Sequence, residues 1–259
     1  MIMVVRRTVT GARLQPMDIT ILTLFPARFE GPFQESMVKR AIDKGLLRLH
    51  IRNIRDYATD KHKVVDDAPF GGGPGMVMKP EPLFAAVEAA RQAVAGVASH
   101  VILLTPQGGV FNQERAQALA RMPHVVLVCG HYEGVDERVH QHLADEELSL
   151  GDFVLTGGEP AAIVVADAVI RLLPGVLGDP ESGTQDSITS GLLQYPQYTR
   201  PRVFRGWEVP DILLSGNHQE VARWRRRKSV QRTFRRRPDL LAKADVLPEE
   251  AESAEGDER

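Results

Sequence analysis

Cysteine is almost absent from this chain, since Cys129 is the only one among 259 residues. A single cysteine can form neither an internal disulfide nor a cysteine-rich zinc site. Small domains that are stabilised by disulfides or by cysteine-bound zinc are therefore excluded. No run of about 18 apolar residues occurs, which excludes a transmembrane helix. The apolar patch before Arg6 is too short for a signal-peptide core. We therefore expect a cytoplasmic protein without a membrane partner.

Several motifs of common enzyme classes are missing as well. The chain has no G-x-x-x-x-G-K-S/T and no G-x-G-x-x-G after a strand, which argues against P-loop nucleotidases and the usual dinucleotide enzymes. It also has no H-E-x-x-H and no G-x-S-x-G. Apolar residues make up 43% and charged residues 25%, as in an ordinary folded protein.

Strand-like and helix-like segments alternate through the first two thirds of the chain. The patterns predict strands at 18–26, 46–54, 101–105, 125–129 and 149–155, and helices at 28–44, 81–97, 112–120, 136–143 and 158–173. Short continuous apolar runs are typical of parallel strands that are covered on both faces. The alternation therefore predicts an α/β fold with a parallel sheet.

Glycine-rich loops follow three of the expected strands, at 106–109, 130–134 and 156–159. Ligands bind at the carboxyl ends of the strands in an open parallel sheet, so these loops predict one small-molecule pocket, with ordinary turns as the alternative. The loop at 70–75 is richer still in glycine, and it either approaches a ligand or partner or is simply flexible. His140 and His142 are expected on a solvated helix face.

The net charge of −2 hides two opposite blocks. Residues 223–237 hold nine basic residues and no acid, whereas residues 247–259 hold six acids and one base. The basic block predicts a surface for RNA or DNA phosphates, and Trp224 within it is expected in the core. We expect the acidic tail to be disordered.

Seven motifs, in a fixed order, resemble those of a known family. They are FGGGPGM at 70–76, TPQG at 105–108, CGHYEGVD at 129–136, SLGDFVLTGGE at 149–159, PGVLG at 174–178, YTRP at 198–201 and LSGNH at 214–218. With them the chain resembles the bacterial tRNA (guanine-N1)-methyltransferases, the TrmD family, from about residue 17 to residue 241. The first sixteen residues and the acidic tail lie outside the resemblance, and Met17 is the start that we expect.

The resemblance implies features that composition does not show. The fold would be an α/β, SPOUT-type parallel sheet with a deep trefoil knot, plus a small, mostly helical C-terminal domain. Family enzymes are homodimers with the active site at the interface, and they transfer a methyl group from S-adenosyl-L-methionine to N1 of guanosine 37 in tRNA with guanosine at position 36. They are also described as needing Mg²⁺, at a site that the resemblance does not assign. The implied domains are an N-terminal extension at 1–16, a knotted donor-binding domain at 17–178, a linker at 179–200, a helical tRNA-binding domain at 201–245 and an acidic disordered tail at 246–259.

Residue roles follow from the resemblance one position at a time. Asp186 matches the proposed general base, and Arg171 matches the arginine proposed to face O6 of the guanine. Donor-binding positions of the family are matched by Pro106, Gly130, Glu133, Leu150, Gly151, Asp152, Phe153, Val154, Leu155, Gly157 and Gly158. The family's tRNA-domain motif and the basic block together suggest RNA contacts for Ser215, Asn217, His218, Arg223, Arg226 and Arg227.

Two other functions stay open beside this one. The first is a SPOUT methyltransferase acting on another RNA position, against which YTRP and SGNH argue. The second is a non-catalytic RNA-binding protein, against which the intact Arg171 and Asp186 argue. The chain departs from the family with His131 in place of the usual arginine, which we expect to alter donor affinity or its pH dependence, and with Phe153 in place of a common tyrosine.

Overall fold

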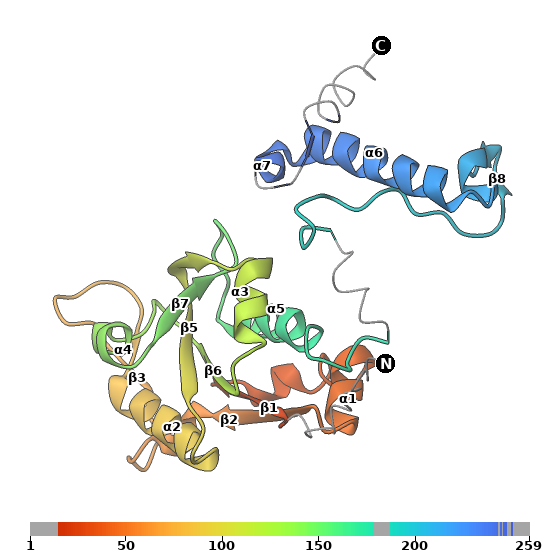
Figure 1. Ribbon diagram of the computed structural model, residues 1–259. Coiled ribbons are helices and arrows are strands. Elements are labelled where there is room, and N and C mark those ends of the chain that lie inside the picture. Colours follow the sequence, from red (N-terminus) through yellow and green to blue (C-terminus); the bar gives the residue numbers. More distant parts are fainter. Residues whose placement is uncertain (1–14, 179–186, 243, 245, 248–249, 251–259) are drawn as a thin grey trace, which may run out of the picture. The chain divides into compact units, whose positions relative to one another are not determined.

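The chain forms two compact units that divide after Gly178 (Figure 1). The computed structural model describes residues 15–178, 187–242, 244, 246, 247 and 250. The expected N-terminal extension therefore lies almost wholly outside the described residues, as does most of the acidic tail.

A five-stranded sheet forms the centre of the larger unit. Its strands are β1 (Met17–Thr23), β2 (Leu47–Asn53), β5 (Ser99–Val110), β6 (His124–Cys129) and β7 (Glu146–Ser149). They lie in the order β2-β1-β6-β5-β7, and every neighbouring pair is parallel. The predicted α/β class with a parallel sheet is confirmed.

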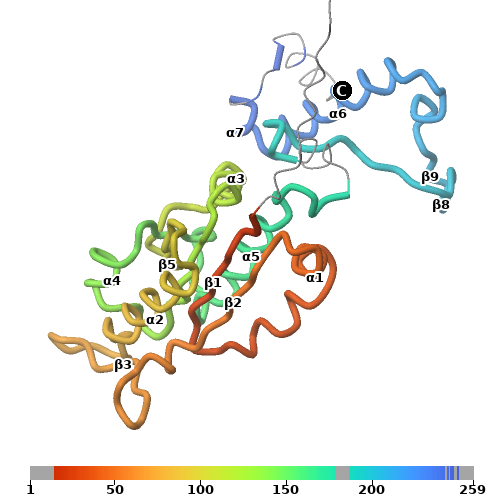
Figure 2. The backbone as a smooth tube through the Cα atoms, turned by 60° about the horizontal axis from the view of Figure 1, so that its bottom comes forward, coloured from red at the N-terminus to blue at the C-terminus, as the bar shows by residue number. Residues whose placement is uncertain are grey.

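Helices cover both faces of this sheet (Figures 1 and 2). One face packs against α1 (Ser36–Asp43), α3 (Gln113–Leu119) and α5 (Glu159–Ile170). The other face packs against α2 (Pro80–Ala93) and α4 (Glu137–His142). Because side chains alternate along a strand, Ile19 and Ile21 of β1 enter the first core and Leu22 enters the second.

Shorter elements connect these layers. The 3₁₀ helices η1 (Pro26–Phe29) and η2 (Ile54–Tyr57) follow β1 and β2 directly. An antiparallel pair, β3 (Asp66–Asp67) and β4 (Val77–Met78), flanks the glycine-rich loop. That loop, orange in Figure 2, projects from the unit beside β3.

Three expected boundaries in the larger unit are wrong. The helix predicted at 28–44 begins only at Ser36, because Pro32 has no N–H to donate and restricts the residue before it. The strand predicted at 149–155 ends where it was expected to begin, since Gly151 has a φ of +148° and takes the chain out of the extended conformation. The strand predicted at 101–105 instead continues to Val110, with a register shift between Leu104 and Gly109.

The smaller unit is built around one long helix. Its elements are β8 (Val203–Phe204), β9 (Trp207–Glu208), η3 (Asp211–Leu214), α6 (His218–Arg236) and α7 (Pro238–Leu241). Leu192 and Val230 form its buried core, against which Phe234 and Leu241 pack. Trp224 is half-buried and lies outside this cluster, so its expected place in the core is wrong.

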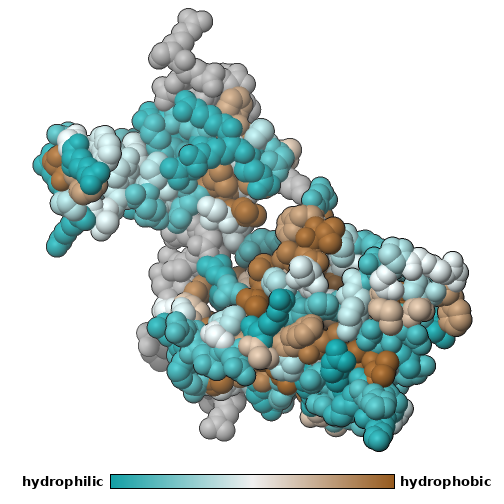
Figure 3. All heavy atoms as spheres, turned by 180° about the vertical axis from the view of Figure 1, so that it is seen from behind, coloured by the Kyte–Doolittle hydropathy of each residue, from teal (hydrophilic) through white to brown (hydrophobic). Residues whose placement is uncertain are grey.

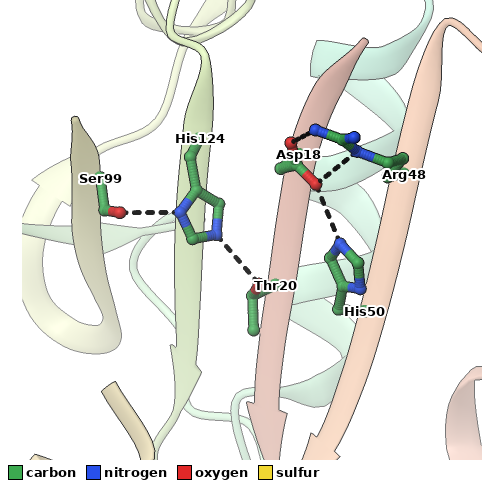
Figure 4. A network of polar contacts seen from close by, with 6 residues as sticks. All are labelled: Asp18, Thr20, Arg48, His50, Ser99 and His124. Carbon is green, nitrogen blue, oxygen red and sulfur yellow. Dashed lines mark hydrogen bonds and ion pairs between the residues drawn. The ribbon is translucent and has the colours of Figure 1, made fainter. Parts of the chain in front are cut away.

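A polar network crosses the sheet at the amino-terminal ends of its strands (Figure 4). Arg48 donates two hydrogen bonds to the Asp18 carboxylate, at 2.9 and 2.6 Å, and the His50 ring lies 2.9 Å from the same carboxylate. The His124 ring bridges Thr20 at 3.0 Å and Ser99 at 2.7 Å. These contacts satisfy polar groups that are otherwise buried against α2.

Both ionisable groups that are most buried in this network have shifted pKa values. Burial acts to raise the pKa of Asp18, but the hydrogen bonds from Arg48 and His50 outweigh it, so this pKa lies below its ordinary value. Burial lowers the pKa of His124, with the charge of Asp18 acting in the opposite sense. At acidic pH each group therefore binds fewer protons in the folded chain than in the unfolded chain. The free energy of unfolding then decreases as the pH falls.

We expect the free energy of unfolding to decrease in two steps on acidification. The first begins below about pH 6.5, where an unfolded histidine gains a proton, and the second below about pH 4, where an unfolded aspartate does. Asp18→Asn should lose about 1–3 kcal/mol at pH 7, because Arg48 and His50 lose their carboxylate partner, and its second step should shrink. Urea unfolding at pH 7, 5.5 and 3 measures both effects.

Asp43→Asn is the matched control, since Asp43 pairs with Lys39 at 2.9 Å on an exposed helix face. It should change stability by less than about 0.5 kcal/mol. An Asp18→Asn protein with native stability at pH 7 would contradict the role given to the network.

Candidate active site

A cavity of about 360 Å³ opens at the carboxyl ends of β5, β6 and β7. It is lined by residues 103–107, 130–135, 148–150 and 153–158, together with Glu137, His140 and Ala161. All three glycine-rich loops that follow the expected strands contribute to this lining. The predicted pocket is therefore present, in the place where open parallel sheets bind ligands.

The loop at 157–158 lies in backbone contact with the end of β6. The Gly158 N–H donates to the Gly130 carbonyl at 2.8 Å. A Cβ atom on Gly158 would lie 2.7 Å from Cα of Cys129, closer than folded backbones allow. This position therefore requires glycine, and the contact fixes two walls of the cavity against each other.

The glycine-rich loop at 70–76 reaches the same cavity through Glu133. A Cβ on Gly75, which has a φ of +75°, would lie 2.5 Å from Cγ of Glu133. The Glu133 N–H donates to the Met76 carbonyl at 3.1 Å, and the Met78 N–H donates to the Gly134 carbonyl at 3.0 Å. These contacts hold the end of the glycine-rich loop against the loop at 130–134, and its expected approach to a ligand or partner stays a prediction.

Exposed apolar side chains form one wall of the cavity. Phe153 is 54% exposed, Val154 is 83% exposed and Leu155 is 40% exposed. Figure 3 shows brown, hydrophobic surface mixed with polar surface on the larger unit, whereas the visible face of the smaller unit is mostly teal. Apolar walls with a few polar groups are typical of small-molecule sites.

A buried carboxylate lies beside the cavity. Glu159 is fully buried, and its Oε1 accepts a hydrogen bond from the Thr23 hydroxyl at 2.8 Å. Its Oε2 lies 3.7 Å from Nε2 of His131 and 3.8 Å from Nη1 of Arg28. Burial, with a smaller contribution from the Glu159 charge, raises the pKa of the Cys129 thiol well above its ordinary value. Cys129 is therefore a neutral core residue and no nucleophile.

The structure gathers most of the residues that the resemblance assigns to the methyl donor. All of them line the cavity except Gly151 and Asp152. Gly151 instead contacts the Ser149 hydroxyl through its N–H at 3.2 Å, at the bend that ends β7. The Asp152 side chain is exposed.

Of the two residues expected at the target base, Arg171 lies in the described part of the chain, and it does not line this cavity. Arg171 caps the carboxyl end of α5, whereas the cavity lies at the amino end of the same helix. Twelve helical residues separate the two ends, a length of about 18 Å. Asp186 lies outside the described residues.

Sequence patterns missed several lining residues. His140 was expected on a solvated face, but it lines the cavity, is 12% exposed in its side chain and lies 2.9 Å from Glu147. Gln107, Tyr132 and Thr156 also line it without having been singled out. Their signal in the sequence was position alone, since each stands in one of the glycine-rich loops predicted at 106–109, 130–134 and 156–159.

The smaller unit carries the residues assigned to RNA. Asn217 caps α6, accepting from the Glu220 N–H at 3.3 Å, and the Ser215 hydroxyl accepts from the Asn217 N–H at 3.1 Å. Arg226 donates two hydrogen bonds to Glu250, each at 2.9 Å. The remaining positions are exposed: His218, Arg223 and Arg227.

No group of three His, Cys, Asp or Glu side chains in the described part of the chain is placed to hold a metal ion. Of the helices described, none is both long enough and apolar enough to cross a membrane.

The sequence of this chain is similar to those of one family of known proteins. The family model described as tRNA (guanine-1)-methyltransferase TrmD matches residues 17–243. A protein of Dehalococcoides mccartyi named tRNA (guanine-N(1)-)-methyltransferase is 59% identical over 227 residues, which cover 88% of this chain and 91% of that protein. Proteins of the same name from Moorella thermoacetica and Geobacter sulfurreducens are each 57% identical, covering 90% and 89% of this chain and 94% and 93% of their own lengths.

Gly158→Ala tests the contact between the two cavity walls. The added methyl group would overlap Cα of Cys129, so we expect a loss of about 1–3 kcal/mol and a melting temperature lower by about 2–4 °C for each kcal/mol. Gly31→Ala is the control, since a Cβ there meets no atom within 4 Å. Equal melting temperatures for both variants would show that the walls are not in contact.

Proposed function

Because the chain belongs to the tRNA (guanine-1)-methyltransferase family, we propose that it transfers a methyl group from S-adenosyl-L-methionine to N1 of guanosine 37 in tRNA. The observation that carries the proposal is the cavity at the carboxyl ends of β5, β6 and β7, which gathers the glycine-rich and apolar segments of three motifs. The deep trefoil knot that the family resemblance implies is part of the proposal.

The residues around the cavity fit the proposed methyl donor. Its volume lies in the range of sites for small organic ligands. Phe153, Val154 and Leu155 offer apolar surface for an adenine ring, and Gly130 and Gly157 leave backbone groups open to polar atoms. A bound sulfonium supplies an activated methyl group, so no covalent intermediate on the enzyme is needed.

The chemistry at the guanine calls for a base and a cation. N1 of guanine carries a proton at neutral pH, and a carboxylate within hydrogen-bond reach takes that proton as the methyl group transfers. We assign this role to Asp186. Negative charge then grows on O6, where the guanidinium of Arg171 donates hydrogen bonds to it. Positioning of donor and acceptor in line supplies much of the remaining acceleration.

The position of Arg171 supports a site that two copies of the chain complete. In one copy this residue lies about 18 Å from the cavity, measured along α5, which is too far for a shared reaction centre. A homodimer that brings Arg171 of one protomer to the donor cavity of its partner removes this distance. Exposed apolar side chains near the cavity and on α5, such as Val154 and Val164, offer surface for such an interface.

The basic face of α6 is the proposed tRNA surface. Arg223 and Arg227 are exposed along this helix, and guanidinium groups bind phosphates through charge and paired N–H donors. Ser215 and Asn217 have capping roles, so their part in RNA binding would be to set the start of α6. We also propose that the reaction needs Mg²⁺, although the described residues contain no cluster of metal ligands for it.

Methyl transfer to two transcripts of one tRNA tests the proposed reaction. One transcript carries guanosine at positions 36 and 37, and in the other position 37 is adenosine. We expect the native protein to methylate only the first, with labelled S-adenosyl-L-methionine as donor. Asp186→Asn should be slower by about 10²–10⁴-fold, as for a lost general base. Arg171→Ala should be slower by about 10²–10³-fold, as for a lost transition-state donor.

Each other outcome favours a different function. Methylation of both transcripts would mean that the target is another RNA position. Donor binding without transfer would favour a non-catalytic RNA-binding protein. A protein that neither binds the donor nor transfers a methyl group would contradict the whole proposal.

Replacing Arg223 and Arg227 together by alanine tests the tRNA surface. If each contacts one phosphate, the slope of log affinity against log salt should become less negative by about 2, with weaker tRNA binding at low salt. Lys39→Ala is the control, because Lys39 is an exposed cation in the larger unit that pairs with Asp43. An unchanged slope in the double variant would place the phosphate contacts elsewhere.

A further inference from the structure

Beside the cavity proposed for the methyl donor, one buried carboxylate oxygen accepts no hydrogen bond. Glu159 begins α5, and its side chain has no exposed surface. Thr23 satisfies Oε1, but Oε2 has no hydrogen-bond partner among the described residues. A buried charged oxygen that is left unpaired costs free energy, so a cation that approaches it should stabilise the site.

Two basic side chains face this oxygen, and neither is within hydrogen-bond distance. Arg28 approaches from η1 at 3.8 Å, but its side chain is 49% exposed and its guanidinium also lies over the Phe25 ring. His131 approaches at 3.7 Å and is 18% exposed. Its ring lies 4.9 Å from that of Phe25 and 5.5 Å from that of Tyr132. The imidazole is thus the more enclosed of the two basic groups.

His131 belongs to the loop at 130–134 that lines the cavity, and Glu159 directly follows the loop at 157–158. A Cβ on Gly157 would be 2.5 Å from Nε2 of His131 and 2.6 Å from Oε2 of Glu159. The next residue, Gly158, holds the Gly130 carbonyl through its N–H. The contact between His131 and Glu159 therefore joins the same two loops as the backbone hydrogen bond does.

Other ionisable groups nearby do not compete for the imidazole. The Tyr132 hydroxyl accepts from Arg55 at 3.4 Å, on the side of η2. The Cys129 thiol is neutral because burial raises its pKa. Glu133 packs against Gly75. Among the described residues, the carboxylate within 4 Å of His131 is that of Glu159.

We propose that His131 is a positioning residue whose protonated ring pairs with Glu159 and braces the loops at 130–134 and 157–158, so that the methyl donor binds more tightly as the pH falls. The proposal rests on the proposed function, because it takes the cavity as the donor site. Histidine is the side chain whose charge ordinarily changes between pH 5 and 8. A charged N–H donor forms a stronger and shorter hydrogen bond to a carboxylate than a neutral one does.

Calorimetric binding of S-adenosyl-L-homocysteine, the product of the proposed donor, tests this at pH 6, 7 and 8. The native protein should bind about tenfold more tightly at pH 6 than at pH 8, as for one hydrogen bond that becomes charge-assisted. His131→Arg, which is charged throughout this range, should vary by less than about twofold. His131→Asn and Glu159→Gln should both lose the pH dependence, because each removes one member of the pair.

His142→Asn is the matched control. His142 is exposed on α4 and does not line the cavity, so this variant should keep the native pH dependence. Equal native affinity at pH 6 and pH 8 would overturn the proposal. So would a native pH dependence that persists in His131→Asn.

Hydrogen exchange of the ligand-free protein separates this proposal from the proposed function. After correction for intrinsic rates, the amides of residues 157–159 should be more protected at pH 6 than at pH 8 in the native protein, and equally protected at both in His131→Asn. If the ligand binds at no pH, the proposed function is contradicted. The hydrogen-exchange result then tests, without any ligand, whether the His131–Glu159 pair braces the two loops. Protection that is independent of pH in the native protein would overturn the bracing.

Discussion

The contact between Gly158 and the end of β6 is the constraint on which the candidate site depends. The chain passes Cys129 so closely that no side chain fits, and the Gly158 N–H holds the Gly130 carbonyl. This contact places the start of α5 beside the loop at 130–134. It also buries Glu159. The cavity, its glycine-rich walls and its buried carboxylate thus follow from one close approach of two backbone segments.

The sheet was predictable because its strands are unusually clear in the sequence. Runs such as 125–129 are apolar throughout, as strands covered on both faces must be, and glycine or proline ends most of them. The pocket followed from the same pattern, since parallel strands bring their carboxyl ends to one edge. The motifs then gave the family, which the comparisons confirm.

Other features depend on contacts that no local pattern encodes. The apolar residues at 153–155 resemble a strand, but Gly151 turns them out of the sheet and leaves them exposed. His140 has the spacing of a solvated helix residue, and only tertiary packing places it at the cavity. The relation between His131 and Glu159 joins segments 28 residues apart in the sequence, so it appears only once the loops are folded together.

A crystal structure of the protein with S-adenosyl-L-homocysteine would show whether the cavity at the ends of β5, β6 and β7 binds the methyl donor. We expect ligand density between the loops at 105–107, 130–134 and 153–158, with Arg171 of a second copy turned toward it. Ligand bound elsewhere, or bound in this cavity with no second copy beside it, would contradict the site or its completion by two protomers.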